Sequence, residues 1–429
     1  MSTELSEQAT KALQPTAESA ARAIVTGFDL KKLSPEFLDD PYPTYRALRG
    51  CDPVHRMPDG SYFLTRYDDC LAVYRDVETW SSDKKIDFRP NFGDSLLYEH
   101  HTTSLVFNDP PYHTRVRKLL APAFTPRALQ ALQARIGELV DRLLENAAER
   151  GEIDLISDFA AAIPVQLIGD MLGIPNDERE PLRRWSLAIL GALEPVLSPQ
   201  QFDTGVTAVA EFKIYLEDII SRRLRDGRSD PAEILSKLLE GSEFAKTGDQ
   251  GECLSQLELI HNCIFLLNAG HETTTNLIGN AIDLLIRHPD AMNDLRRHPE
   301  VLETAIEEFL RMESSNQLGN RRATRDTRLG GVAMASGSYV HIGIGAANRD
   351  PAQFPDPDRL DIRREPNRHL AFGTGIHACA GMSLARMEAE VGIGRFLSRF
   401  SLIEPAAAPV RGGRARFRGF TSYTVRLER

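Results

Sequence analysis

Cys379 has the surroundings expected of a metal ligand. It lies in the segment Phe372–Gly381, FGTGIHACAG, which is followed by an apolar helical run. Glycines allow the chain to bend tightly, and the N–H groups at a helix start favour negative charge. We therefore expect the pKa of this thiol to be lowered and the thiolate to bind a soft metal. An ordinary buried cysteine is the alternative, but three glycines, an aromatic residue and a histidine together argue against it.

Segment 372–381 resembles the haem-binding loop of the cytochrome P450 family, because every fixed position of that pattern is present. The resemblance extends from about Pro41 to the C-terminus and is greatest with soluble bacterial members. It implies a mainly α fold with small β sheets, in which a helical bundle surrounds a buried haem b (iron protoporphyrin IX). It also implies that Cys379 is the axial iron ligand and that the cofactor is contacted by Phe372, Gly373, His377 and Gly381.

A second polar group lies within a long helical pattern. Residues 255–258 form a capping box and residues 288–289 are a stop signal, so the pattern predicts one helix of roughly 48 Å. Its centre, residues 268–275, reads NAGHETTT, and glycine with three threonines is a poor choice for a helix centre. Small residues there allow close approach of a ligand, and threonine hydroxyls can bond back to the preceding turn.

This central stretch has three readings. A zinc-protease motif fails, because Thr275 stands where a second histidine is required after His271. A helix with a polar outer face is the plain alternative. The resemblance favours an acid–alcohol pair, in which Thr273 hydrogen-bonds to bound dioxygen and Glu272 relays protons from solvent, a role typically worth ~10²–10⁴-fold in rate. On this reading His271 points away from the haem.

The same helix is expected to line a substrate pocket through Phe265, Asn268 and Ala269. Asn268 is polar where family members often have an apolar residue. It either contacts the substrate or bonds within the helix. Residues 80–108 and 176–215 are expected to form a lid over this pocket.

The haem carboxylates need cationic or donor partners. His113 and Arg117 lie one helical turn apart, and the resemblance assigns the propionates to these two residues together with Arg321 and His377. Because Arg321 is followed by Arg322, this assignment could shift by one residue. Two neighbouring cations of the same helix, Arg115 and Lys118, either form a solvated basic face or help an acidic electron-transfer protein to dock.

Glu308 and Arg311 are spaced i, i+3 and share one helix face. Taken alone they form an ordinary surface pair worth ~0–1 kcal/mol. The resemblance instead places them, with Arg359, in a buried structural network that fixes the loop carrying Cys379.

Composition limits the class of protein. The chain has 429 residues and a formal net charge of −10, which argues against nucleic-acid binding and against a membrane-surface protein. The longest strongly apolar run, residues 263–267, is too short to span a bilayer. Five scattered cysteines favour a reducing compartment, so we expect a cytoplasmic protein that is not membrane-bound.

The expected organisation is a flexible segment, residues 1–25, followed by one catalytic domain, residues 26–429. Helical patterns dominate residues 115–315. The remaining expectations are strands at 54–56, 62–65 and within 331–344, a final hairpin from 401–403 and 421–427, and irregular structure at 80–108 and 351–366.

Together these features predict a haem-thiolate monooxygenase. It would insert one oxygen atom from O2 into a small organic substrate, with electrons from a separate ferredoxin or flavodoxin and its reductase. A peroxide-driven or non-oxygenating member of the same family is one alternative. A non-enzymatic haem-binding sensor or carrier is the other.

Overall fold

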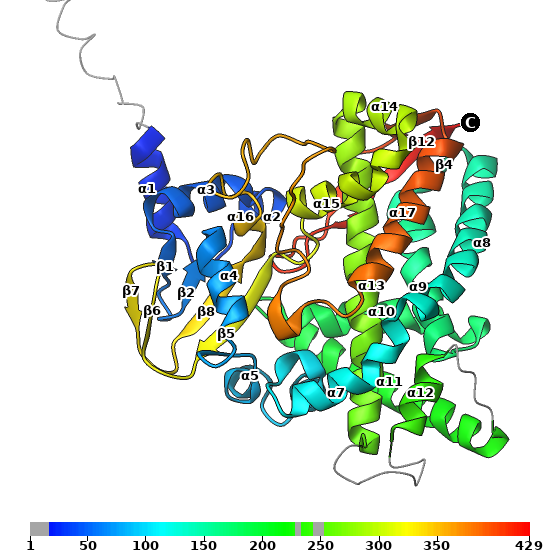
Figure 1. Cartoon of the computed structure of the whole chain (residues 1–429), viewed down its shortest axis with the longest axis horizontal. Coiled ribbons are helices and arrows are strands. Elements are labelled where there is room, and N and C mark those ends of the chain that lie inside the picture. Colours follow the sequence, from blue (N-terminus) through cyan, green and yellow to red (C-terminus); the bar gives the residue numbers. More distant parts are fainter. Residues whose placement is uncertain (1–16, 228–232, 243–252) are drawn as a thin grey trace, which may run out of the picture.

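The computed structural model describes residues 17–227, 233–242 and 253–429. It is mainly helical, with the largest sheet at one side of the molecule and a small three-stranded sheet beside the helix Pro126–Arg150 on the other (Figure 1). The helices are α1 (Ala17–Gly27), α2 (Pro35–Asp39), α3 (Tyr42–Cys51), α4 (Tyr67–Arg75), α5 (Lys85–Phe92), α6 (Leu96–Thr103), α7 (Tyr112–Leu120), α8 (Pro126–Arg150), α9 (Ala162–Leu172), α10 (Glu180–Gly191), α11 (Pro199–Asp226), α12 (Ile234–Glu240), α13 (Gln256–Arg287), α14 (Pro289–Arg297), α15 (Leu302–Met312), α16 (Ile344–Ala347) and α17 (Met382–Arg399).

The strands are β1 (Val54–Arg56), β2 (Tyr62–Leu64), β3 (Trp80–Ser81), β4 (Glu152–Asp154), β5 (Leu318–Ala323), β6 (Thr327–Leu329), β7 (Val332–Met334), β8 (Tyr339–Gly343), β9 (Leu402–Pro405), β10 (Val410–Arg411), β11 (Phe420–Ser422) and β12 (Thr424–Glu428). The largest sheet has the order β1-β2-β8-β5-β3, in which β2 and β8 are parallel and the other pairs are antiparallel. A second sheet has the order β4-β12-β9, and β6-β7 and β10-β11 are separate two-stranded ribbons.

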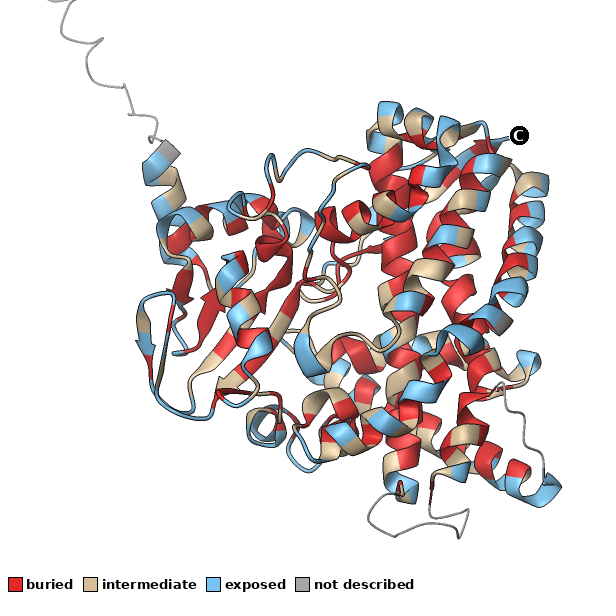
Figure 2. Cartoon of the chain, viewed as in Figure 1, coloured by how far each residue is buried: buried red, intermediate tan, exposed pale blue. Residues whose placement is uncertain are grey.

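Helix α13 is the predicted long helix and runs through the helical half of the molecule (Figure 1). Its capping box is complete, because Ser255 and Glu258 each bond the other's backbone N–H. Most of its residues are buried, since α9, α10, α11, α15 and α17 all pack against it. Figure 2 shows the half of this helix nearer α14 as continuously buried. Side chains on nearly every face of such a buried helix point into the interior of the protein.

Several expected elements are confirmed. Strands β1 and β2 pair as predicted, and residues 351–366 contain neither helix nor strand. The C-terminal strands β9 and β12 are antiparallel partners, although β10 and β11 intervene along the chain and β4 completes the sheet.

Other expectations are corrected. Residues 80–108 are not irregular: they form β3, α5, α6 and a short 3₁₀ turn, Leu105–Phe107. Ser95 caps α6 by accepting a hydrogen bond from the Tyr98 N–H. The helix is short and has little amphipathic pattern, so this cap is its main signal in the sequence. Of the segment 1–25, residues 1–16 lie outside the described residues, while residues 17–25 belong to α1, which packs against α3.

The described chain contains an apolar stretch longer than residues 263–267, the run expected to be the longest. Leu155–Leu172 has the length and composition of a membrane-crossing helix. Most of this stretch is buried inside the fold, where α9 packs against α13. It therefore serves as a core segment in this structure.

Candidate active site

The loop before α17 holds Cys379 in a bend that requires glycine. Gly373 and Gly375 have φ values of +63° and +72°, in the left-handed region that other residues rarely adopt. A Cβ atom on Gly375 would also lie 2.8 Å from the Tyr74 carbonyl oxygen. The Cys379 N–H closes the bend by donating to the Phe372 carbonyl at 2.9 Å. The backbone of this loop therefore requires glycine at positions 373 and 375.

The expected lowering of the thiol pKa is wrong for the protein chain alone. Burial raises the pKa of Cys379, and this effect outweighs the hydrogen bond from the Gly381 N–H and the charges of Arg117 and Arg386. A thiolate here therefore needs the positive charge of a bound metal in addition to the helix start. Within the described ranges, no group of three or more His, Cys, Asp or Glu side chains could hold a bare ion. A metal on Cys379 must bring its other ligands with it.

Around this loop the structure gathers side chains suited to an anionic cofactor. The rings of His113 and His377 lie 4.1 Å apart, and none of their four nitrogens has a hydrogen-bond partner. Burial lowers the pKa of His377 to about 2, and the charges of Arg321, His113 and Arg117 lower it in the same direction. Buried donors and cations without partners are costly unless a ligand satisfies them. The two carboxylates of a haem fit this set of residues.

The choice between Arg321 and Arg322 is resolved by their contacts. Arg321 is buried against the Tyr74 ring and shares the electrostatic environment of His113 and His377. Arg322 instead binds Asp87 and the Gly337 carbonyl. Arg321 is therefore the member of the pair that belongs to this cluster.

Lys84 is a member of the cluster that the sequence reading missed. It is 1% exposed, and its Nζ makes no hydrogen bond, although Asp87 lies 3.6 Å away. Burial lowers the pKa of Lys84 to about 7, and Arg321 contributes to the shift. The neighbouring Lys85 is solvent-exposed and pairs with Asp83. No sign in the sequence shows which of these two adjacent lysines is buried, because the segment around them has no clear helical or strand pattern.

The centre of α13 has a short stretch that neighbouring elements leave uncovered. Ala269 is exposed and Thr273 half-buried in a helix whose other central residues are largely buried. The Thr273 hydroxyl donates to the Ala269 carbonyl at 2.7 Å, the back-bond expected of a threonine in a helix. Gly270 has a different role from the one expected, because a Cβ there would lie 2.4 Å from Cδ1 of Ile168. Gly270 permits α9 to pack closely against α13. Ala269 and Thr273 form the open part of α13.

Glu272 is buried beside Ala269 and Thr273. One carboxylate oxygen accepts a bond from Nη1 of Arg414 at 2.5 Å, and the other has no partner. Burial raises the pKa of Glu272 to about 7, although Arg414 opposes this shift. Such a group exchanges a proton near neutral pH, as a proton relay requires. Arg414 comes from the segment between β10 and β11, about 140 residues away, so no local pattern could identify it.

The remaining polar residues of this stretch are also buried. Asn268 is 2% exposed, and neither its oxygen nor its nitrogen has a partner, so the alternative that it bonds within the helix is wrong. His271 lies 3.2 Å from the Ser186 hydroxyl of α10 and takes a structural place, as expected. Phe265 is half-buried and packs against the main core.

The predicted ion network is present with one different member. Glu308 and Arg311 are both fully buried and joined by two bonds of 2.7 and 2.8 Å. Arg364, not Arg359, is the further arginine, with its Nε 3.1 Å from Glu308. Arg359 is exposed and pairs with Asp361, contributing only its carbonyl to the network. In a segment without regular structure, spacing does not determine which side chain turns inward.

A second carboxylate, Glu307, ties α15 directly to the cysteine loop and α17. It binds Arg386 through two bonds of 2.6 and 2.8 Å and His369 at 3.1 Å. Arg386 in turn covers the Phe372 ring. The loop is thereby held at both ends by adjacent glutamates of one helix.

Arg115 is not free to form a docking surface. Its guanidinium binds both oxygens of Glu258 and the Cys253 carbonyl. Lys118, on the same helix, is solvent-exposed. Only Lys118 of this pair remains available to a partner protein.

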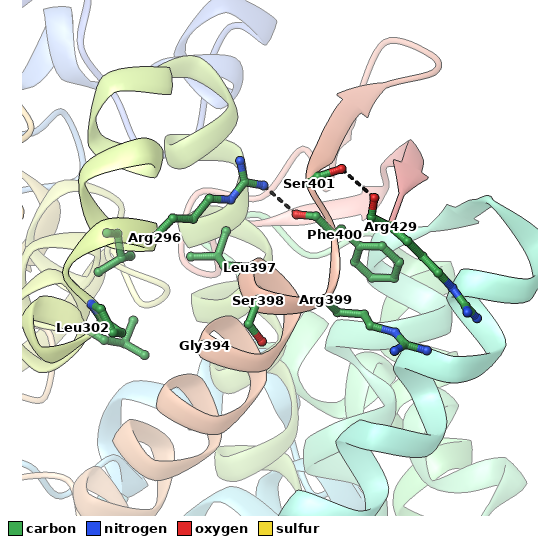
Figure 3. A pocket seen from close by; sticks show the side chains of 11 residues that line it. Arg296, Leu302, Gly394, Leu397, Ser398, Arg399, Phe400, Ser401 and Arg429 are labelled. Atoms are coloured by element: carbon green, nitrogen blue, oxygen red, sulfur yellow. Dashed lines mark hydrogen bonds between the residues drawn. The ribbon is translucent and has the colours of Figure 1, made fainter.

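A surface pocket of about 440 Å³ lies elsewhere, between the ends of α14 and α17 (Figure 3). Its arginines are already engaged: Arg296 donates to the Phe400 carbonyl, and Arg399 and Arg429 pair with Glu145. None of the predicted site residues lines this pocket. It is not the site formed by Cys379, Glu272 and the cationic cluster.

The comparisons with known proteins agree with this geometry. The family model described as Cytochrome P450 matches residues 53–411. The chain is 34% identical over 369 residues to the biotin biosynthesis cytochrome P450 of Bacillus subtilis (strain 168), covering 85% of this chain and 90% of that protein. It is 38% identical over 370 residues to the vitamin D(3) 25-hydroxylase of Pseudonocardia autotrophica, covering 84% and 87%. The crystal structure of P450BioI in complex with hexadec-9Z-enoic acid ligated acyl carrier protein is similar with a TM-score of 0.84 and 32% identity, over 92% of this chain and all of that one. The chain therefore belongs to the cytochrome P450 family and is a P450 monooxygenase.

Proposed function

We propose that the chain binds haem b through the Cys379 thiolate and inserts one oxygen atom from O2 into a small organic substrate. Electrons come from a separate ferredoxin or flavodoxin and its reductase. The observation that carries the proposal is the cluster of His113, His377 and Lys84, whose buried side-chain nitrogens make no hydrogen bond, beside a glycine-bent cysteine loop. A cofactor with two carboxylates and a metal satisfies both features at once.

Each group of residues has a defined task in this proposal. Bound haem supplies the iron chemistry, and a thiolate ligand favours O–O cleavage over reversible oxygen carriage. Arg117, Arg321 and Lys84 neutralise the carboxylates of the cofactor, with His113 and His377 as further donors. Phe372, Gly373 and Gly381 would shape the loop that contacts the cofactor.

Proton delivery is assigned to α13. Glu272 holds a proton near neutral pH and exchanges it with solvent, while Arg414 stabilises its ionised form. Thr273, on the open part of the helix, orients the hydrogen bond through which that proton is passed on. In the structure the single hydroxyl proton of Thr273 is donated to the Ala269 carbonyl, so the oxygen is left as an acceptor, and the hydroxyl must turn from this bond to donate a proton itself.

The substrate is proposed to lie beside Phe265 and Ala269, with Asn268 as a polar contact. Relatives named above act on vitamin D(3) or are complexed with an acyl carrier protein that carries a fatty acyl group. Both are largely apolar molecules with few polar groups. A pocket with one aromatic, one small and one amide side chain fits this class.

A Cys379→Ser variant tests the metal ligand. Reduced wild-type protein under carbon monoxide is expected to have the long-wavelength absorption band of a thiolate-bound haem, and the variant is expected to lack it. Cys51→Ser, which makes the same chemical change at an exposed position, is the matched control and should keep the band. A band retained in the Cys379 variant would overturn the assignment.

A further inference from the structure

Three arginines alternate in the segment between β10 and β11, and two of them hold buried carboxylates. Arg414 binds Glu272 of α13, and Arg418 binds Glu313 at 2.7 Å with both side chains almost fully buried. The third arginine, Arg416, has no such partner. Within the described part of the chain, no carboxylate oxygen lies within salt-bridge distance of its guanidinium, which distinguishes Arg416 from its two neighbours.

The Arg416 guanidinium is nevertheless held in place. Nε donates to the Leu193 carbonyl at 2.9 Å, and Nη1 donates to the Leu318 carbonyl at 2.8 Å. A guanidinium has five N–H donors, so three remain, one on Nη1 and two on Nη2. Glu194 lies near the same segment, but its oxygens accept the backbone N–H groups of residues 415–417. A half-buried cation is thus held in place with three N–H donors, including both of Nη2, still unused.

The position of Arg416 connects it to the active site. Its neighbour Arg414 reaches Glu272, one turn from the open stretch of α13 at Ala269. Leu318 begins β5, the strand that also carries Arg321. Burial lowers the pKa of His341 to about 3, and the Arg416 charge adds to this shift, so the guanidinium lies close to the side chains of β8 as well. Arg416 is therefore set between the centre of α13 and the sheet that borders the cofactor cluster.

We propose that Arg416 binds the carboxylate of an organic-acid substrate and so orients the apolar remainder of the molecule toward the reacting centre. This inference rests on the proposed monooxygenase function. A guanidinium edge matches a carboxylate through two parallel charge-assisted bonds. One guanidinium without a carboxylate partner matches a monoanion, since the neighbouring cations Arg321 and Lys84 are assigned to the carboxylates of the cofactor. The two backbone carbonyls remove the entropic cost of fixing the side chain before the substrate arrives.

The test compares acids with their methyl esters on the haem-loaded enzyme. Straight-chain alkanoic acids of eight to sixteen carbons, and arylalkanoic acids, are titrated while the low-spin to high-spin shift of the Soret band is recorded. In the wild type, the best acid is expected to bind roughly 10-fold to 100-fold more tightly than its methyl ester, although the ester is more apolar. Arg416→Gln is expected to abolish this preference, Arg416→Lys to retain part of it, and Arg426→Gln, an exposed control with the same charge change, to leave it intact.

Each result has a defined meaning. Equal binding of acid and ester by the wild type, or an acid preference that survives in Arg416→Gln, would overturn the inference. Faster loss of haem from Arg416→Gln with an unchanged acid preference would also overturn it, because Arg416 would then serve a cofactor carboxylate. Failure of the proposed function itself is recognised separately, by the absence of the thiolate carbon monoxide band in the wild type.

Discussion

In the proposed mechanism, Glu272 is the residue whose ionisation should affect turnover most directly. Burial raises the pKa of its carboxyl to about 7, while the charge and hydrogen bond of Arg414 act in the opposite direction. Below that pH the carboxyl is protonated and neutral, and above it the carboxylate is ionised and held by Arg414. Since Arg414 stabilises only the ionised form, its removal must raise the pKa further.

The direction of these pKa shifts predicts how turnover depends on pH. The amount of product formed per reductant consumed is expected to fall as pH rises through about 7, because Glu272 then loses the proton it delivers. In Arg414→Gln the midpoint should move to higher pH, and in Glu272→Gln the dependence should disappear. Arg426→Gln, on the exposed face of β12, should leave the midpoint unchanged. A midpoint that stays fixed or moves to lower pH in Arg414→Gln contradicts the assigned coupling.

Thr273 is expected to control how oxygen use is coupled to product. Thr273→Ala should consume reductant but release mostly hydrogen peroxide, because the hydroxyl that orients the hydrogen bond is gone. Thr275→Ala is the matched control, since its hydroxyl makes the same kind of back-bond, to the His271 carbonyl at 2.9 Å, but is buried. Fully coupled turnover in Thr273→Ala would remove this role. Wild-type turnover with peroxide alone at the reductase-driven rate would instead favour the peroxide-driven alternative.

At the scale of elements, α15 holds the cysteine loop through two adjacent glutamates. Glu308 receives bonds from Arg311, Arg364, Asn367 and the Asp361 N–H. Glu307 reaches Arg386 of α17. Because the loop contains only a short 3₁₀ turn, Gly375–His377, and no strand, these side-chain bonds fix its position in place of backbone hydrogen bonds to a sheet.

The corrected network predicts a difference between two nearby arginines. Arg364→Ala is expected to lower the free energy of unfolding by about 1–3 kcal/mol, because it removes charge-assisted bonds from the fully buried Glu308. Arg359→Ala should change it by no more than about 1 kcal/mol, since that arginine is exposed and paired only with Asp361. Urea unfolding and haem content of the two variants measure this difference. Equal losses, or a larger loss for Arg359→Ala, would restore the family-based assignment.

For the whole molecule, we propose that an electron-transfer protein docks on the exposed face of α7, the helix whose His113 ring lies 4.1 Å from the His377 ring of the cysteine loop. Arg115 is committed to Glu258, the capping-box residue of α13, so it connects α7 to the long helix rather than to a partner. Lys118 is the exposed cation of this helix. Since the chain has a formal net charge of −10, a local cation has particular weight in attracting an acidic partner.

Lys118→Glu is accordingly expected to slow the first reduction by an acidic ferredoxin or flavodoxin several-fold at low ionic strength, and less at high salt. Substrate affinity, measured by the Soret shift, should be unchanged because the residue lies outside the pocket. Lys32→Glu, at an exposed position before α2, serves as the matched charge reversal. Equal reduction rates for all three proteins would place the docking surface elsewhere.

The sequence by itself determined the features whose causes are local. Glycines at 373 and 375 are needed for left-handed backbone, and the capping box at Ser255 marks the start of α13. Both signals lie within a few residues of the structure they produce. The family, the mainly helical fold and the candidate metal ligand were therefore readable from short segments.

Only the tertiary structure decided which distant side chains meet. Spacing could not separate Lys84 from Lys85 or Arg364 from Arg359, and nothing near Glu272 pointed to Arg414. Gly270 accommodates a neighbouring helix rather than a ligand, which depends on where α9 lies. The same holds for the thiol of Cys379, whose pKa follows burial by the whole fold more than the nearby helix start. Burial and partner choice arise from contacts between segments far apart in the chain, and these exist only once the chain has folded.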